Sequence, residues 1–243
     1  MVQATRRTTV RGPTFIRLLA RLADVDAPQS SQSLPDHLSG WLNWTQAIAL
    51  STALDGRLPE PADEAPAFED GPAAECARLR EALAETIANA RELVPSAQRE
   101  PAPVPPVEGW VPPPPDYAPY RQRYLTLQRA MQGTTGRLRG ELRDLLGRAS
   151  EDMARLAELD AVMELALSPR EQRLLGTVPG LLETHFERLR RAHADEGSPD
   201  APATATHDAW LDIFRKDMQS VLLAELDVRF QPVEGLLAAL RAR

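Results

Sequence analysis

The chain has 243 residues, of which 43% are hydrophobic and 26% charged, with 22 prolines and one cysteine. This apolar fraction is too high for a wholly disordered chain, and one cysteine excludes a disulfide framework or a multi-cysteine metal site. The net charge of −7 argues against a protein built mainly to coat nucleic acid. No stretch approaches the roughly 20 apolar residues of a membrane span, so we expect a soluble, cytoplasmic protein.

Three helices are expected before residue 95. A first helix follows Pro13, and its apolar face comprises Phe15, Leu18, Leu19, Leu22 and Val25. Ser33 is expected to cap a second helix. The apolar face of this second helix comprises Leu34, Leu38, Trp41, Ile48 and Leu54. A third helix is expected to begin at Asp70 or Gly71, with Pro72 in its first turn. Its apolar stripe, which makes Cys76 a buried residue, comprises Cys76, Leu79, Leu83, Ile87, Ala90 and Val94.

Ten prolines fall between Pro95 and Pro119, and proline lacks the amide proton that a helix needs. This segment is therefore expected to be an extended linker of polyproline II type. The predicted organisation is a disordered N-terminus over residues 1–12, a three-helix segment over 13–94, the linker over 95–119 and a C-terminal helical bundle over 120–243. The two helical parts could instead share one core.

The C-terminal half is expected to be long helices. Residues 120–167 contain no proline, and their apolar residues recur about every 3.6 positions, which predicts a long central helix. Its length requires that it either protrude or bend, and the glycines within it are the places where it could bend. They are Gly133, Gly136, Gly140 and Gly147.

Two further helix starts are expected after residue 167. The sequence Ser168-Pro169-Arg170-Glu171 combines an N-cap, a first-turn proline and a capping-box glutamate, which predicts a new helix with a kink at Pro179. A further helix is expected over residues 208–230, and Pro232 would open a short last one. The fold class is therefore all-α, with one or two helical bundles of about six to seven helices, a long central helix and a proline-rich linker.

Motifs for nucleophilic catalysis, phosphate binding and metal binding are missing from the sequence. We therefore expect no catalytic, cofactor-binding or metal-binding residues, and a protein that is not an enzyme. His185 and His193 lie two turns apart, and their pattern favours a solvated helix face with salt bridges to Arg188, Arg190 and Arg191. An enzyme site assembled around His185 and nearby carboxylates is the alternative.

Tryptophans are the candidate interaction residues. In Trp41-Leu42-Asn43-Trp44, the helical spacing favours core packing for both tryptophans, whereas an exposed Trp44 would be an anchor for a partner protein. Trp110 lies inside the proline-rich linker, where no helix can bury it, so it either docks back onto a domain or binds a partner.

Three parts of the sequence resemble a known family. They are Arg17–Ala23 with Trp41–Ser51, the segment LAELDAVMELALSPREQRLLGTVP at Leu156–Pro179, and the segment FRKDMQSVLLAELDVRFQPVEGLL at Phe214–Leu237. They resemble an uncharacterised family of Gram-negative bacterial proteins, domain of unknown function 3348. The resemblance implies a genetic context: similar proteins tend to be encoded beside stator-like or Tol/Exb-like inner-membrane channel proteins and OmpA-like peptidoglycan-binding proteins.

Together these observations favour a non-enzymatic helical interaction or adaptor protein. By analogy with similar proteins, it would be a soluble accessory of a cell-envelope complex, cytoplasmic or peripheral to the inner membrane. Its partners would be proteins, and a homo-oligomer of the chain itself is a further possibility that the sequence leaves open. One alternative is a nucleic-acid-associated or regulatory protein that uses an arginine-rich helix, although interleaved acids argue against nucleic acid as a partner. One such cluster comprises Arg137, Arg139, Arg143 and Arg148, and a second comprises Arg188, Arg190 and Arg191. The other alternative is an acidic helical coat protein of granules or of a membrane surface.

Overall fold

A computed structural model describes residues 14–24, 40–55, 71–95, 114–196 and 209–242. All regular secondary structure in these ranges is α-helical, which confirms the all-α fold class. The helices are α1 (Thr14–Ala23), α3 (Trp44–Asp55), α4 (Gly71–Ala88), α5 (Ala118–Gly147), α6 (Glu151–Leu175), α7 (Val178–Glu196) and α8 (Ala209–Arg241). The predicted disordered N-terminus and Trp110, with most of the predicted linker, lie outside the described residues.

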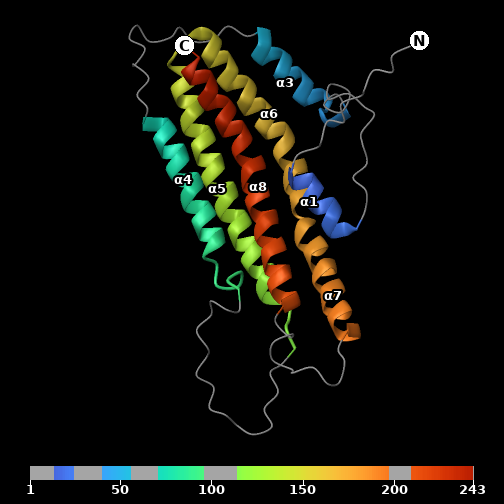
Figure 1. Ribbon diagram of the computed structural model, residues 1–243. Coiled ribbons are helices and arrows are strands. Elements are labelled where there is room, and N and C mark those ends of the chain that lie inside the picture. The colour runs from blue at the N-terminus through green and yellow to red at the C-terminus, as the bar shows by residue number, and fades with distance from the viewer. Residues whose placement is uncertain (1–13, 25–39, 56–70, 96–113, 197–208, 243) are drawn as a thin grey trace, which may run out of the picture.

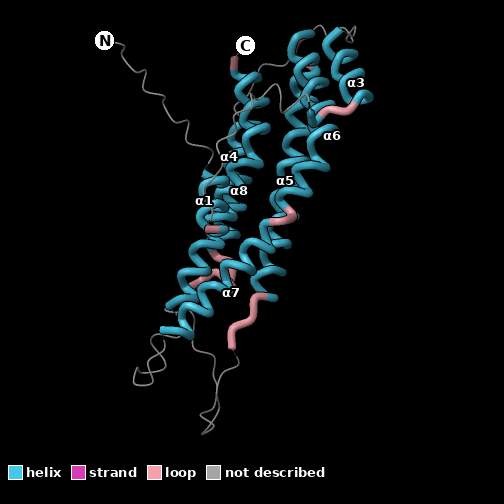
Figure 2. The backbone as a smooth tube through the Cα atoms, turned by 90° about the vertical axis from the view of Figure 1, so that its right-hand side faces the viewer, coloured by secondary structure: helices cyan, strands magenta, loops and turns pink. Residues whose placement is uncertain are grey.

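Four rods form an elongated up-and-down bundle (Figures 1 and 2). Helix α4 runs in one direction, α5 runs back beside it, α6 and α7 follow one another in the direction of α4, and α8 returns alongside α5 (Figure 1). Helices α1 and α3 are added to the outside of this bundle, α1 across α7 and α8 and α3 along α6. None of the described helices is long and apolar enough to cross a membrane.

The core lies between α5 and α8, which pack most extensively of all the helix pairs. Helix α5 has 30 residues and supplies the predicted long central helix, with Tyr124 and Met131 fully buried. At the end where α5 and α8 begin, four aromatic rings, those of Tyr120, Phe186, Trp210 and Phe214, pack with neighbouring centroids 5.0–6.0 Å apart. Three of these contacts are edge-to-face and that of Tyr120 with Phe186 is tilted, and as a group they tie α5, α7 and α8 together.

Helices α1 and α4 of the N-terminal half complete this same core. Phe15 and Leu22 of α1, and Leu83 and Ile87 of α4, are buried in one cluster with the side chains of α5, α7 and α8. Helices α1, α3 and α4 each pack mainly on helices of the C-terminal half. The question that the sequence left open is therefore answered in favour of a shared core. Cys76 is buried, as its stripe predicts.

The stretch predicted as one long helix is divided by a turn at Arg148–Ser150. Helix α5 ends at Gly147, and α6 begins with Ser150 as its N-cap, whose Oγ accepts a hydrogen bond from the Met153 N–H at 3.3 Å. The chain thus bends where the last of the glycines stands, and α6 folds back onto α5.

Three predictions based on proline are wrong. Helix α6 continues through Pro169 to Leu175, so the capping-box pattern at residue 168 does not begin a helix, and α8 likewise continues through Pro232. Pro169 is exposed, so the carbonyl that its missing N–H leaves unpaired lies on the outer side of the helix. The next helix begins at Val178, with Pro179 in its first turn instead of at a kink.

The α6–α7 break requires glycine. A Cβ at Gly176 would lie 2.9 Å from the carbonyl oxygen of Gln172, closer than side chains approach backbone oxygen atoms. This close turn lets α7 continue in nearly the direction of α6 and reach the aromatic cluster (Figure 1).

We expect Ile87→Ala to lower the free energy of unfolding of the whole protein by about 2–5 kcal/mol, because Ile87 is fully buried in the shared core. Ile213, which is about half exposed, is the control. Ile213→Ala should change the free energy of unfolding by less than about 0.5 kcal/mol. Urea denaturation followed by circular dichroism measures both. A separate early transition for α4, with the remainder unaffected, would contradict a shared core.

We expect Pro169→Ala to raise the free energy of unfolding by about 1–3 kcal/mol, because alanine restores an N–H inside α6 and removes the ring clash. Pro119 is the matched control, since it lies in the first turn of α5, where no N–H is needed. Pro119→Ala should have little effect. Equal effects of the two substitutions would show that Pro169 is not strained.

Candidate functional site

Helix α3 begins at a capping box that interrupts the predicted second helix. The Asn43 side chain accepts a hydrogen bond from the Gln46 N–H at 2.8 Å, and the Gln46 side chain accepts one from the Asn43 N–H at 2.9 Å. Leu42 and Asn43 are not helical, so α3 starts at Trp44. The sides on which its residues lie are therefore not set by the helical repeat of the residues before Leu42. Ser33, Leu34 and Leu38 of the predicted second helix lie outside the described residues. Because the helix is broken at Leu42, Trp41 does not share one helical face with Ile48 and Leu54.

The outer side of α3 carries exposed apolar residues. Trp44 is 80% exposed, Ile48 50% and Leu54 51%, whereas Ala53 is the residue of α3 that is buried. Core packing is thus wrong for Trp44, Ile48 and Leu54. Trp44 is exposed, and its role as an anchor for a partner protein stays a prediction. We name as the α3 face the exposed residues Trp44, Ile48, Ser51, Leu54 and Asp55.

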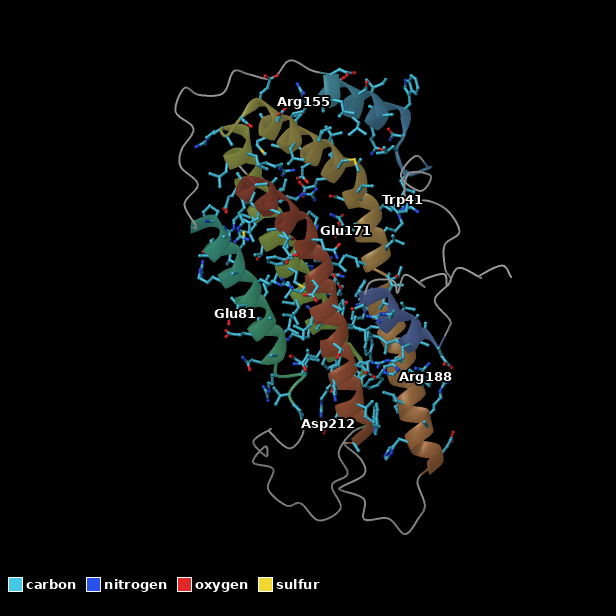
Figure 3. The ribbon with its side chains drawn as sticks, turned by 45° about the horizontal axis from the view of Figure 1, so that its top comes forward. Trp41, Glu81, Arg155, Glu171, Arg188 and Asp212 are labelled. Atoms are coloured by element: carbon cyan, nitrogen blue, oxygen red, sulfur yellow. The ribbon has the colours of Figure 1, made fainter. Side chains whose placement is uncertain are left out.

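Trp41 fastens the start of this segment to α6. The Arg170 guanidinium lies over the Trp41 ring, 4.4 Å from its centroid, which is a cation–π contact (Figure 3). Trp41 is half-buried. It therefore packs against α6 at the surface of the bundle, whereas the sequence predicted that it lies in the core. Trp110 lies outside the described residues.

A groove of about 460 Å³ lies between α5 and α6. Its lining residues are Arg143, Ala161, Glu164, Leu165, Ser168, Pro169 and Gln172. Leu165 is 78% exposed, and its carbonyl receives no helical hydrogen bond because Pro169 has no N–H. Ser168 is two residues, or about 200° of helix rotation, from Arg170, so the groove and the α3 side lie on nearly opposite sides of α6.

The most enclosed polar group is Glu225 of α8, which is fully buried. Its carboxylate accepts hydrogen bonds from the Tyr124 hydroxyl at 2.5 Å, the Gln128 side chain at 3.0 Å and the Arg229 Nε at 2.9 Å. Arg229 also pairs at 3.2 Å with Glu171 of α6, an exposed residue that is labelled in Figure 3. This network gives the buried Glu225 carboxylate a positively charged partner in Arg229, and it joins α5, α6 and α8.

His185 is buried, so the prediction of a solvated face is wrong for this residue. Its Nε2 lies 2.9 Å from Asp217 Oδ2, and Arg188 Nη2 lies 2.9 Å from its Nδ1. A guanidinium only donates, so Nδ1 accepts and Nε2–H donates to Asp217. Asp217 also pairs with Arg21 of α1 at 2.9 Å. Both ring nitrogens are engaged, and neither the α5–α6 groove nor the cavity beside Cys76 includes His185.

Most arginines of the two predicted clusters have partners. Arg139 pairs with Asp160 and Arg143 with Glu164, both at 2.6 Å, across α5 and α6. Other pairs lie within one helix, Arg137 with Glu141 and Arg190 with Glu187. The interleaved acids noted in the sequence therefore neutralise much of each cluster.

Cys76 lines a cavity of about 170 Å³ between α4 and α5. Burial raises the pKa of its thiol, and the nearby carboxylates of Glu141 and Glu75 raise it further, so the thiol stays protonated rather than nucleophilic. Within the ranges that the structure describes, no group of three or more His, Cys, Asp or Glu side chains is placed to hold a metal ion.

The described helices define a helical-bundle protein with large apolar side chains exposed on two sides of α6. A family model described as "Protein of unknown function (DUF3348)" matches residues 1–242, so the chain belongs to this family, as its sequence resemblance predicts. No curated protein and no solved structure matches the chain.

We expect stability to fall above about pH 10 through the buried tyrosines. Burial and the adjacent Glu225 carboxylate raise the pKa of Tyr124 well above 10, and burial also raises the pKa of Tyr117. Below pH 10 both states hold the phenolic proton. Above it, the unfolded chain releases the proton while the folded chain keeps it, which favours unfolding.

Tyr124→Phe should cost about 1–3 kcal/mol at pH 7, because Glu225 loses a donor, and should reduce the decline above pH 10 without abolishing it, since Tyr117 remains. Denaturation of both proteins between pH 8 and about 11 measures the two slopes. Identical slopes for the wild type and Tyr124→Phe would show that Tyr124 does not contribute to the loss of stability above pH 10.

Proposed function

We propose that this protein is a non-enzymatic interaction protein that joins other protein chains as a soluble, cytoplasmic accessory of a cell-envelope complex. The observation that carries the proposal is that exposed apolar side chains flank α6 on nearly opposite sides, at the α3 face and at the Leu165 groove. An adaptor needs two separate contact surfaces, and large exposed apolar residues such as these are typical of protein contacts.

The Leu165 groove suits a polypeptide segment of a partner protein. Such a segment would place an apolar side chain against Leu165 and donate a hydrogen bond to the unpaired Leu165 carbonyl, with Ser168 and Gln172 as further polar partners. The charged residues of its lining, Arg143 and Glu164, already pair with each other, so the groove favours an uncharged segment.

The cell-envelope context comes from the resemblance to proteins encoded beside inner-membrane channel proteins. It is consistent with a chain whose buried histidine and carboxylates are engaged in interhelical contacts, such as His185 with Asp217 and Glu225 with Arg229. These pairs serve the fold, which leaves the exposed apolar surfaces as the features available for function.

Purification of the tagged full chain from its own host, after mild detergent extraction, tests the proposal. An inner-membrane protein should co-purify at a fixed ratio and should in turn recover the full chain when it carries the tag. Leu165→Glu should reduce this recovery at least about ten-fold, because a charge would be buried in the contact.

Ile213→Glu is the matched control, because Ile213 is exposed on α8 away from α6. It should leave the recovery unchanged. Recovery of the chain without a membrane-protein partner, or an equal loss in both variants, would overturn the proposal.

A further inference from the structure

Helix α3 is unusual in having no charged outer side. Its sequence, WTQAIALSTALD, carries no charge before its last residue, Asp55, whereas every other described helix bears charged residues on its exposed side. Thr45, Ala49 and Thr52 are also exposed, so the outer surface of α3 is apolar or neutral as far as Leu54. A helix that is apolar on all sides is normally covered on all sides.

The α3 face is self-complementary in shape. Trp44, Ile48, Ser51 and Asp55 follow one another at spacings of four, three and four, so they form one stripe along the helix. If a second α3 lies antiparallel on the first, about a two-fold axis midway along the helix, the large Trp44 meets Asp55 and Ile48 meets the small Ser51. A two-fold contact requires this kind of self-matching surface.

The charge of the α3 face points to the same arrangement. Asp55 stands at the C-terminus of α3, where the negative end of the helix dipole opposes a carboxylate, and α3 has no acidic residue in its first turn and no basic residue in its last. In an antiparallel pair, each Asp55 lies at the positive N-terminal end of the other α3. The Ser51 hydroxyl donates to Asp55 Oδ2 at 3.3 Å, which holds the carboxylate on the face.

A membrane surface fits this face less well. Helices that lie on membranes carry Lys or Arg beside their apolar side, and anionic lipid repels acidic proteins. Helix α3 has no basic residue, and the chain has a net charge of −7. For two acidic molecules to approach, contact through a surface whose one charged residue, Asp55, stands at its end involves little repulsion.

We propose that the α3 face binds the α3 face of a second copy of this chain in an antiparallel, two-fold dimer. The inference rests on the proposed interaction role of this face and names its occupant. A helix of 12 residues is about 18 Å long and covers less than the ~800 Å² per partner of a standard stable interface. The dimer is therefore reversible, with a dissociation constant in roughly the micromolar range.

Sedimentation of the purified full chain from about 1 to 300 µM tests the dimer. The expected result is a monomer–dimer equilibrium that Ile48→Glu weakens at least about ten-fold and that Ile213→Glu leaves unchanged. A monomer at every concentration overturns the proposal, and so does equal weakening by the two variants. Circular dichroism verifies that each variant is folded.

Asp55→Asn distinguishes an effect on dimerisation from an effect on the stability of the monomer. Removal of the carboxylate relieves the unfavourable contact with the dipole of its own helix, so the dilute monomer should be as stable as the wild type or more so. The dimer loses the attraction to the second helix and should weaken about two- to five-fold. An unchanged dimerisation constant overturns the antiparallel alignment.

Cross-linking with a short bifunctional maleimide tests the alignment directly. The two Ser51 residues are about 4.5 Å apart along the axis of an antiparallel pair, and the two Thr45 residues about 13 Å. Ser51→Cys should therefore cross-link efficiently, while Thr45→Cys, exposed on the same helix, should not. The wild type gives the background, because its one cysteine, Cys76, is buried.

Equal cross-linking of the two variants would overturn the antiparallel dimer. These experiments use the purified chain alone, so they are independent of the co-purification that tests the proposed function. A monomer that still recovers a membrane protein through Leu165 would refute the dimer alone. A dimer without such a partner would refute the adaptor role alone. Binding of the α3 face to a different protein or to anionic vesicles, with no dimer, would also refute the inference.

Discussion

The structure depends on covering α8 on every side. Sixteen of its 33 residues are buried, and they include consecutive pairs such as Val221 and Leu222, and Leu236 and Leu237, that point in different directions. A single neighbour covers one stripe of a helix, so α8 needs α5, α4, α7 and α1 around it. Since α5 and α8 run in the same direction, the chain must return between them, and α6 with α7 forms that return. Helices α1 and α4 thus belong to the core.

The helical segments could be predicted from periodicity, but not how they join. Apolar spacing located α1, α4 and α5, because each has one buried stripe. The boundary between α5 and α6 was missed, although Ser150 followed by Glu151 and Asp152 is an N-cap signal. The stronger-looking signal at Ser168 failed because Pro169 lies on the exposed side, where a lost hydrogen bond costs less than the tertiary packing of a continuous helix gains.

The candidate site was only partly predictable. Trp44 stood out as a possible anchor, but the stripe that placed Ile48 in the core assumed one helix from Ser33 onwards. The spacing of Asn43 and Gln46 is the sequence signal for the capping box that resets the phase of α3. Leu165 and the groove had no local signal, since its exposure depends on how α6 lies against α5. The buried positions of Glu225 and His185 likewise arise from the tertiary fold.

The α3 face and the Leu165 groove lie on nearly opposite sides of α6, and this arrangement determines how a dimer would present its grooves to a partner. Arg170 holds the α3 segment on one side of α6, and the Leu165 groove opens on nearly the opposite side. A two-fold pair joined through α3 therefore leaves both grooves free and directed outwards. Each groove alone offers a small contact, but the two grooves of the proposed dimer would bind two copies of a partner in the same assembly. The second binding event would then be intramolecular, which strengthens attachment without any new contact. Under these two proposals, weak dimerisation and a weak groove would be sufficient for firm attachment to an oligomeric partner and for release when that partner disassembles.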